Sequence, residues 1–533
     1  MVAISSGIVQ SSSTGAVALT VAYDAGSNSY TLTDSNHNAA FVSADRVAGE
    51  PAGVVGYSQS NGNQLTLYTT TPSSHSPLSY VGLGVWSDTQ NSGADRNTTT
   101  FDTFTYGTPT PASATPRTGA AAYNIDLVAY LTTTGVETRS LTGSGYFNAD
   151  FLSGAFDVLV YPTEHFLVAN SQTSGSGYQL RGGGALSSSD STFSGQVSFQ
   201  DNGAATYVGP ISGRLYGPAG QEVGASFSGF SAPGASLVGS FFGAQAGVQP
   251  GENVSMANIL VPQQFGVVDA DLMYGNPPTG TALQFSVDQL ALTPSGNVTL
   301  THGGGFSFLL DSTFTTAGIV ASSLPHFTTY QGTVSGVPLE LDLYKVGSGN
   351  TELALSYMDL ALWRQTETVP GSPSNQATAF VFGLTTPQTV IAGLTGSAHY
   401  AGVAYGSAVD AEQQAAYTVS GTSTFDVSFS AQTLSGSMSL TGARIGGGAG
   451  QNFGTFSFSG AMPANGPLPP GNVGLAATAI PISYNGVVQG PSQIQAQFFG
   501  PTAEEVGGSF FITYRNASSE DISIIGAAAA KKH

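Results

Sequence analysis

The chain contains one series of landmarks twice, and this duplication constrains its fold more than any other feature. The landmarks of the first half return in the second half in the same order, at an offset of 276 or 277 residues. They end at Tyr68 and Tyr344, at Trp86 and Trp363, at Gly107 and Gly383, and at Gly119 and Gly396. Because so long a period is typical of duplicated domains rather than of a solenoid, the sequence predicts two related lobes.

Apolar and polar residues alternate with a period of two in both halves, which is typical of β-strands. Residues 17–34 read as a strand, a turn containing Asp24, Gly26 and Asn28, and a second strand. Similar runs recur along the chain with turn residues between them, while helical periodicity is scarce. The sequence therefore predicts an all-β protein made of antiparallel sandwiches or barrels. Trp86 and Trp363, the only tryptophans of the chain, end apolar runs and are predicted to anchor the cores.

Proline-rich and glycine-rich stretches predict where each lobe divides. Residues 108–116 contain three prolines, which stiffen a linker and donate no hydrogen bonds to a sheet. A counterpart lies near Pro387, and residues 243–251 are the predicted hinge between the lobes. The predicted domains are a handle module at 1–110 and a β-barrel at 115–246 in the first lobe, and a handle module at 252–385 and a β-barrel at 390–533 in the second.

The charge of the chain excludes several classes of function. Charged residues make up only 8% of the chain, with 32 Asp and Glu against 12 Lys and Arg and a formal net charge of −20. Nucleic acid binding needs clustered basic residues, and anionic membranes repel such a chain. The absence of cysteine excludes disulfides, thiolate zinc sites and cysteine nucleophiles. The sequence also predicts no transmembrane helix and no signal peptide at its first residues.

A second repeated motif, Gly-Pro-x-x-x-Glu-Val-Gly, occurs at an offset of 283 residues. Its landmark residues are Gly217, Pro218, Glu222 and Gly224 in the first copy, and Gly500, Pro501, Glu505 and Gly507 in the second. Proline fixes φ at a turn, the glutamate can accept unpaired backbone N–H groups there, and glycine within a strand indicates close backbone approach. The alternative is an acid–base role for Glu222 and Glu505, but neither has an evident partner in its own copy. We therefore predict a structural role for the motif.

The residues around this motif resemble a known family. The strings Leu215-Tyr-Gly-Pro-Ala-Gly-Gln-Glu-Val-Gly-Ala-Ser-Phe227 and Phe498-Phe-Gly-Pro-Thr-Ala-Glu-Glu-Val-Gly-Gly-Ser-Phe510 are similar to the barrel motif of transferrin-binding protein B and its relatives. The family's final strand, which ends near a Phe-Gly-Ala-Lys-type sequence, is assigned to Ser240-Phe-Phe-Gly-Ala-Gln245 and Ile524-Ile-Gly-Ala-Ala528, again 283 residues apart. The resemblance implies an all-β fold with two tandem lobes, each an antiparallel β handle module followed by an eight-stranded antiparallel β-barrel.

The resemblance also implies a function. Members of the family are typically outer-membrane surface lipoproteins that capture iron-bearing host proteins and work beside a TonB-dependent transporter, and smaller relatives bind haem or other host factors. We therefore expect a non-enzymatic, monomeric binding protein of the bacterial outer membrane or cell surface, or a secreted one. Its expected partners are a protein or haem-like ligand and a TonB-dependent outer-membrane receptor. No resident cofactor is expected, and haem or iron would be transported cargo.

In the family, handle loops of the first lobe and adjoining barrel loops contact the partner. Here the resemblance implies residues 71–78 and 88–98, which contain His75, Asp88, Asp95 and Arg96. These four are the predicted partner-binding residues, and for His75 the alternative is a solvated loop histidine. No two of the seven histidines have metal-ligand spacing, so no metal site is predicted.

Two other classes of function stay open. A structural or adhesive surface protein would use the same barrels as spacers and would bind no nutrient ligand. A glycan-acting enzyme would need two carboxylates that face each other across a cleft, and the few acidic residues of this chain mostly fall in turns. We rank the enzyme last.

Overall fold

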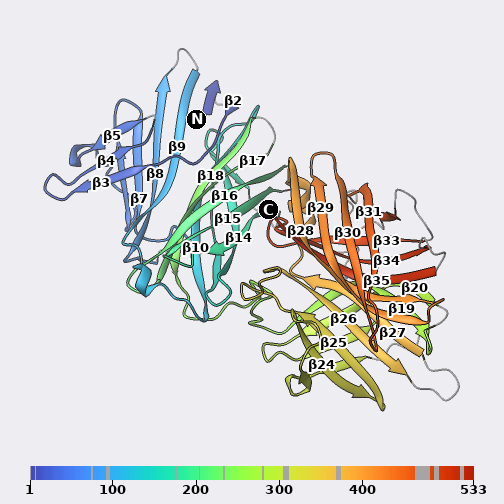
Figure 1. The fold of residues 1–533 in the computed structure, drawn as a ribbon. Helices are drawn as coiled ribbons and strands as arrows, with labels where there is room; N and C mark the ends of the chain where they lie inside the picture. The colour runs from blue at the N-terminus through green and yellow to red at the C-terminus, as the bar shows by residue number, and fades with distance from the viewer. Residues whose placement is uncertain are drawn as a thin grey trace. The chain divides into compact units, whose positions relative to one another are not determined.

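The computed structural model describes residues 2–5, 8–35, 37–73, 76–91, 96–173, 177–202, 205–231, 234–278, 281–303, 311–367, 374–462, 480–484, 491–515 and 521–533. The chain divides into two compact units, residues 1–250 and 251–533, and each is almost entirely β (Figure 1). The helical segments of the described residues are η1 (Ser43–Asp45), η2 (Ala112–Ala114), η3 (Thr316–Gly318) and α1 (Gln388–Gly393). None of the helices in these ranges has the length and hydrophobicity needed to cross a membrane.

The first unit begins with a handle of two antiparallel sheets. Its strands are β1 (Val2–Ser5), β2 (Ile8–Ser12), β3 (Thr20–Asp24), β4 (Ser29–Thr33), β5 (Asn38–Phe41), β6 (Val54–Ser58), β7 (Asn63–Tyr68), β8 (Val81–Asn91) and β9 (Arg96–Gly107). The larger sheet has the order β2-β1-β9-β8-β7-β6, and β3-β4-β5 form the smaller one. Leu32 and Phe41 of the smaller sheet are buried with Leu65 and Trp86 of the larger one, which holds the two sheets together.

An eight-stranded barrel follows in the first unit. Its strands are β10 (Ala120–Thr133), β11 (Arg139–Asp150), β12 (Ala155–Phe166), β14 (Tyr178–Leu186), β15 (Thr192–Asp201), β16 (Ala205–Tyr216), β17 (Glu222–Phe230) and β18 (Ala235–Gln245), with β13 (Ser171–Thr173) added beside β12. The pairing of β11 with β12 closes the ring. Inward-facing aromatic residues fill the barrel, and Phe147 contacts Phe156, Phe193 and Phe241 at ring-centroid distances of 5.2, 4.9 and 6.1 Å.

The second unit has the same two parts. Its handle strands are β19 (Gln263–Gly275), β20 (Thr281–Leu292), β21 (Val298–His302), β22 (Ser312–Phe314), β23 (Ile319–Val320), β24 (Phe327–Val334), β25 (Val337–Tyr344), β26 (Met358–Glu367) and β27 (Ser374–Gly383), and they form one nine-stranded sheet. The closed barrel consists of β28 (Ser397–Asp410), β29 (Ala415–Ser428), β30 (Thr433–Arg444), β31 (Gln451–Ala461), β32 (Ile480–Tyr484), β33 (Gln493–Phe499), β34 (Glu505–Arg515) and β35 (Asp521–Lys532). The predicted all-β fold of two handle-plus-barrel lobes is confirmed. Trp86 and Trp363 are buried, as their sequence context predicted.

In each unit, one glutamate of the repeated motif ties the barrel to the handle. Glu222, the first residue of β17, accepts hydrogen bonds from the backbone N–H groups of residues 79, 80 and 81, each 2.8 Å long. Glu505, the first residue of β34, accepts from residues 356, 357 and 358 at 2.6, 2.9 and 3.0 Å. Both glutamates are buried, and both sets of N–H groups lie where a handle strand, β8 or β26, begins. We call this arrangement the glutamate clamp.

The clamp explains why the sequence prediction for these glutamates needs a correction. Each glutamate does accept backbone N–H groups, but these belong to a handle strand more than 140 residues away and not to the motif's own turn. The glycines of the motif make this approach feasible. At Gly217 and Gly500, with φ of +86° and +90°, a Cβ atom would lie 2.7 Å from the ring of Tyr80 or Tyr357. At Gly507, a Cβ atom would lie 2.2 Å from Met358.

The assignment of the final barrel strand was wrong by four residues in the second lobe. On β17, Val223 pairs with Gly243 of β18, whereas the equivalent Val506 of β34 pairs with Ala530 of β35. Gly243 therefore corresponds to Ala530 and not to Gly526. Residues 527–530 are all alanine, so this stretch offers no landmark from which the register can be read.

A buried pair of carboxyl groups lies in the second handle. Asp269 and Asp271 of β19 are 0% and 1% exposed, and the Oγ of Ser286 lies 2.7 Å from a carboxyl oxygen of each. A serine hydroxyl donates only one hydrogen bond, so the second short contact requires a proton on one of the carboxyl groups. Burial raises the pKa of both groups, and that of Asp269 lies well above its usual range.

Replacing the clamp glutamate of one unit is expected to destabilise that unit and to leave the other unit unchanged. We predict that Glu222→Gln and Glu505→Gln each lower the free energy of unfolding by about 1–3 kcal/mol, because the amide replaces one acceptor oxygen with an NH2 group that cannot accept from the buried backbone N–H groups. Hydrogen exchange should rise at residues 79–81 in the first variant and at residues 356–358 in the second. Each variant is the control for the other, and unchanged exchange at both junctions would contradict the clamp.

The stability of the second unit is expected to fall as pH rises through the weakly acidic range. Burial raises the pKa of Glu505 from 4.5 to about 7, so between these values the folded chain holds a proton that the unfolded chain releases. The free energy of unfolding is then highest near pH 4.5 and no longer falls above about pH 7. Between these two pH values, Glu505 lowers the free energy of unfolding by at most about 3 kcal/mol. Asp269 adds to the change in the same direction.

Denaturant unfolding at several pH values measures this dependence. Glu505→Gln and Asp269→Asn should each flatten the pH profile, because the amide stands in for the protonated acid. His399→Ala with Asp426→Asn, which removes an exposed pair of the second barrel, is the matched control and should leave the profile unchanged. A wild-type profile that rises between pH 5 and 7 would contradict the prediction.

Candidate functional site

The two handles pack against their barrels to very different extents. In the second unit, handle and barrel share a cluster of 20 buried hydrophobic residues, which includes Leu360, Val381 and Ile525. The corresponding cluster of the first unit has six buried residues: Val81, Leu83, Val85, Val128, Tyr216 and Phe242. Because the hydrophobic contact in the first unit is narrow, part of its barrel face remains open beneath the handle.

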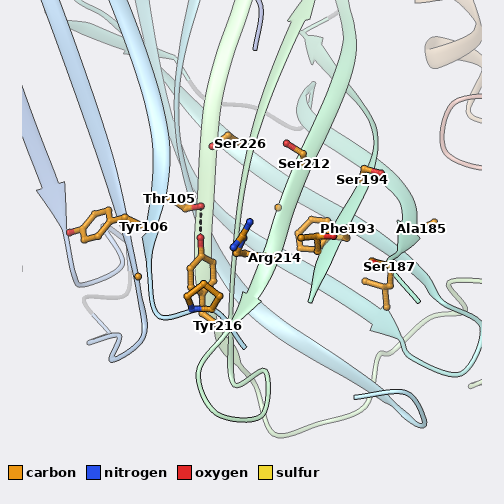
Figure 2. A pocket seen from close by; sticks show the side chains of 15 residues that line it. Thr105, Tyr106, Ala185, Ser187, Phe193, Ser194, Ser212, Arg214, Tyr216 and Ser226 are labelled. Atoms are coloured by element: carbon orange, nitrogen blue, oxygen red, sulfur yellow. Dashed lines mark hydrogen bonds between the residues drawn. The ribbon is translucent and has the colours of Figure 1, made fainter. Parts of the chain in front are cut away.

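This open face is a groove that runs between β9 of the handle and strands β14–β18 of the barrel (Figure 2). It consists of two neighbouring cavities of about 650 and 850 Å³. Thr105, Ser212, Arg214 and Ser226 line both cavities and mark where they meet. Figure 2 shows Arg214 beside Tyr216, whose hydroxyl lies 3.0 Å from the Thr105 hydroxyl. We call this site the handle–barrel groove.

A row of serines crosses the barrel face of the groove. Ser194, Ser212, Ser226 and Ser240 lie on β15, β16, β17 and β18 and are direct partners in successive strand pairs. The Oγ atoms of Ser226 and Ser240 are 2.8 Å apart, and Ser240 is fully buried. The other three line the groove, so their hydroxyl groups are available to a polar ligand.

Arg214 is the cation of the groove. It lies on the outer barrel face between Thr192 and Gly224 of the neighbouring strands, and its side chain is exposed. Among the described residues, no hydrogen bond or ion pair holds its guanidinium group, although Asp190 interacts with it electrostatically. Arg117 differs from Arg214, because its guanidinium group donates hydrogen bonds to the backbone oxygens of Ser187 and Asp190.

Acidic groups gather in the second cavity. Burial, together with the nearby carboxylate of Asp34, raises the pKa of Asp102 to about 6. The Nδ1 atom of His37 lies 3.3 Å from Asp34, and its ring meets Trp86 edge-on at 6.0 Å. These side chains come from β9, from β8 and from the segment between β4 and β5, so their spacing in the sequence gives no sign that they meet.

The equivalent positions of the second unit are buried. Thr105, Arg214 and Tyr216 correspond to Val381, Gln497 and Phe499, which are all buried. Ser226 and Ser509 hold the same place in the repeated motif, yet Ser509 is fully buried and donates to the backbone oxygen of Val268 in β19 at 2.7 Å. The groove is therefore a feature of the first unit, where Thr105 and Arg214 line a face whose equivalent residues are buried in the second unit.

The structure gives only partial information on the predicted partner-binding residues. His75 and Asp95 lie outside the described residues, and of Arg96 only the backbone is described, as the first residue of β9. Asp88 was expected in an exposed loop, but it lies within β8 and is 8% exposed. Its Oδ1 atom accepts a 2.6 Å hydrogen bond from Gln90. The prediction of a loop was wrong here because the pairing of β8 with β9 continues as far as Asn91 and Asn97.

The described residues offer no constellation for catalysis by the motif or for a metal. The carboxylate oxygens of Glu222 and Glu505 accept hydrogen bonds from backbone N–H groups. Their geometry therefore gives no support to the alternative that these glutamates act as a general acid or base. No group of three or more His, Cys, Asp or Glu in the described ranges is arranged to hold a metal ion.

Comparison with known proteins finds one family that matches the second barrel. Residues 392–532 match the family described as C-lobe and N-lobe beta barrels of Tf-binding protein B. None of the curated proteins compared with the chain matches it.

Several solved structures are similar to the chain, each with 15% sequence identity. They include intact Ap-TbpB with its N and C lobes, with a TM-score of 0.24 over 97% of this chain and 95% of that one. A mutant transferrin-binding protein B from Haemophilus parasuis Hp5 gives 0.26 over 98% and 99%. The isotype 1 protein from serogroup B Neisseria meningitidis gives 0.22 over 92% and 87%. The predicted resemblance is confirmed: at residues 392–532 the chain carries a barrel domain of the transferrin-binding protein B type.

Proposed function

We propose that this chain is a non-enzymatic binding protein of the bacterial surface. In this proposal it captures an iron carrier, haem or another ligand from the surroundings and delivers it to a TonB-dependent outer-membrane transporter. The observation that carries the proposal is the match of residues 392–532 to the barrels of Tf-binding protein B. The same resemblance is the basis for proposing an outer-membrane, cell-surface or secreted location.

The packing of the barrels supports binding at outer surfaces and loops. Both barrel interiors are filled by buried hydrophobic side chains, such as Phe425 and Phe458 with ring centroids 5.3 Å apart. A ligand of the size of a protein or a haem therefore has to bind outside the barrels. Loops on a stiff β scaffold are the usual place for such binding.

We keep residues 88–98 and residues 71–78 as the proposed partner contact. His75, Asp95 and Arg96 are the candidate contact residues. Asp88 is reassigned to a supporting role, because its buried carboxylate holds Gln90 within the sheet. Because its side chain is almost fully buried, a partner would meet this residue only indirectly.

Capture of an iron-bearing ligand tests the proposal. The full chain, immobilised and exposed to serum or growth medium, is expected to retain an iron-bearing protein or haem, detected by iron analysis and by a visible absorbance scan. Retention of neither would overturn the proposed function and favour the structural or adhesive alternative.

A triple variant tests the proposed contact. His75→Ala with Asp95→Ala and Arg96→Ala should weaken capture by about tenfold or more, since a few contact residues usually carry most of the binding energy. His399→Ala with Asp426→Ala removes an exposed pair in the second unit and serves as the matched control. If the triple variant is folded and binds as tightly as the wild type, the contact lies elsewhere.

A further inference from the structure

The handle–barrel groove has the chemistry of a ligand site that is distinct from the proposed partner contact. At two equivalent positions, the closed second unit has Val381 and Phe499 where the first unit has a threonine and a tyrosine, and the uncharged, buried Gln497 stands where the first unit has the exposed Arg214. A face that only required closer packing of the handle would not need a charged side chain at this position. Polar side chains there match a polar occupant.

The charges of the groove limit how many negative groups that occupant carries. Arg214 is exposed at the meeting point of the two cavities, and a guanidinium group recognises a carboxylate through two parallel hydrogen bonds. Asp34 and Asp102 line the second cavity, and the chain as a whole has a formal charge of −20. A second negative group would meet repulsion, so one carboxylate fits this groove better than a doubly charged phosphate.

The serine row of the groove suits the hydroxyl groups of a ligand. Ser194, Ser212 and Ser226 present hydroxyl groups on three adjacent strands and so span roughly 10 Å across the sheet. A serine hydroxyl both donates and accepts hydrogen bonds, so it can pair with a sugar hydroxyl that acts as either acceptor or donor.

We propose that the handle–barrel groove binds a saccharide that carries a single carboxylate, with the carboxylate at Arg214 and sugar hydroxyls along the serine row. This inference goes beyond the proposed function and does not depend on it, since it concerns other residues and another class of ligand. It assigns the groove to recognition only, with no bond formed or broken.

Calorimetric titration of the full chain with defined saccharides tests the proposal. An aldotetraouronic acid, in which one glucuronate is attached to a short xylose chain, should bind at micromolar to millimolar concentration. Xylotetraose, its neutral counterpart, should bind at least about tenfold more weakly, as expected when a charged hydrogen bond is lost. D-glucuronate alone tests whether one sugar suffices, and binding of either acidic probe supports the proposal.

Variants locate the binding. Arg214→Gln should reduce the affinity for the acidic saccharide by about tenfold or more and leave that for xylotetraose unchanged. Arg444→Gln changes an exposed arginine on the barrel of the second unit and should have no effect. Ser212→Ala should weaken both saccharides, because it removes a hydroxyl without adding bulk. Thermal unfolding verifies that each variant is folded.

Three results would overturn the proposal: no binding of either acidic probe, equal affinities of Arg214→Gln and the wild type, or equal competition by inorganic phosphate. The capture experiment separates this inference from the proposed function. Arg214→Gln should still retain the iron-bearing ligand, so either conclusion can fail while the other stands.

Discussion

A buried carboxylate that accepts three backbone N–H groups from a distant strand is the interaction on which each lobe depends. Without it, the handle strand would begin with donors that face the barrel and have no partner. The motif glycines serve this contact, because any side chain at Gly217 or Gly500 would collide with the tyrosine that enters the handle. Tyr123 and Tyr400 complete the junction by donating to the backbone oxygens of Gly220 and Ala503, at 2.6 and 2.7 Å.

Beyond the clamp, the two lobes use one docking scheme for two purposes. In the second unit the handle covers its barrel through a hydrophobic interface, and the Ser509 hydroxyl donates a hydrogen bond to the handle backbone. In the first unit the same serine position, Ser226, faces a polar groove with Arg214 at its centre. A small number of side-chain exchanges at equivalent positions therefore separates an interface that only holds the handle from one that can also receive a ligand.

The sequence predicted the parts of this molecule that repeat or alternate locally. Duplication and strand periodicity predicted two all-β lobes, and the family resemblance of the Gly-Pro-x-x-x-Glu-Val-Gly motif implied the handles and barrels, because each signal lies within a short stretch of chain. The groove was not predictable, since Thr105, Arg214 and Ser226 are brought together only by the docking of a handle strand on a barrel. Asp88 was misplaced because polar residues at the end of a strand resemble a loop. The register of β35 was misplaced because a run of alanines reads the same at every shift.

The clamp bonds to main-chain N–H groups, so the side chain of the third residue it holds can change from Val81 to Met358, while the first two residues are Ser-Tyr in both copies. The hydrogen bonds of the clamp therefore place few constraints on the rest of the handle's sequence. A module fastened in this way can acquire a new outer surface by mutation while its seat on the barrel is inherited unchanged. After duplication of such a unit, one copy can keep its handle packed on its barrel while the other copy acquires residues that bind a new ligand.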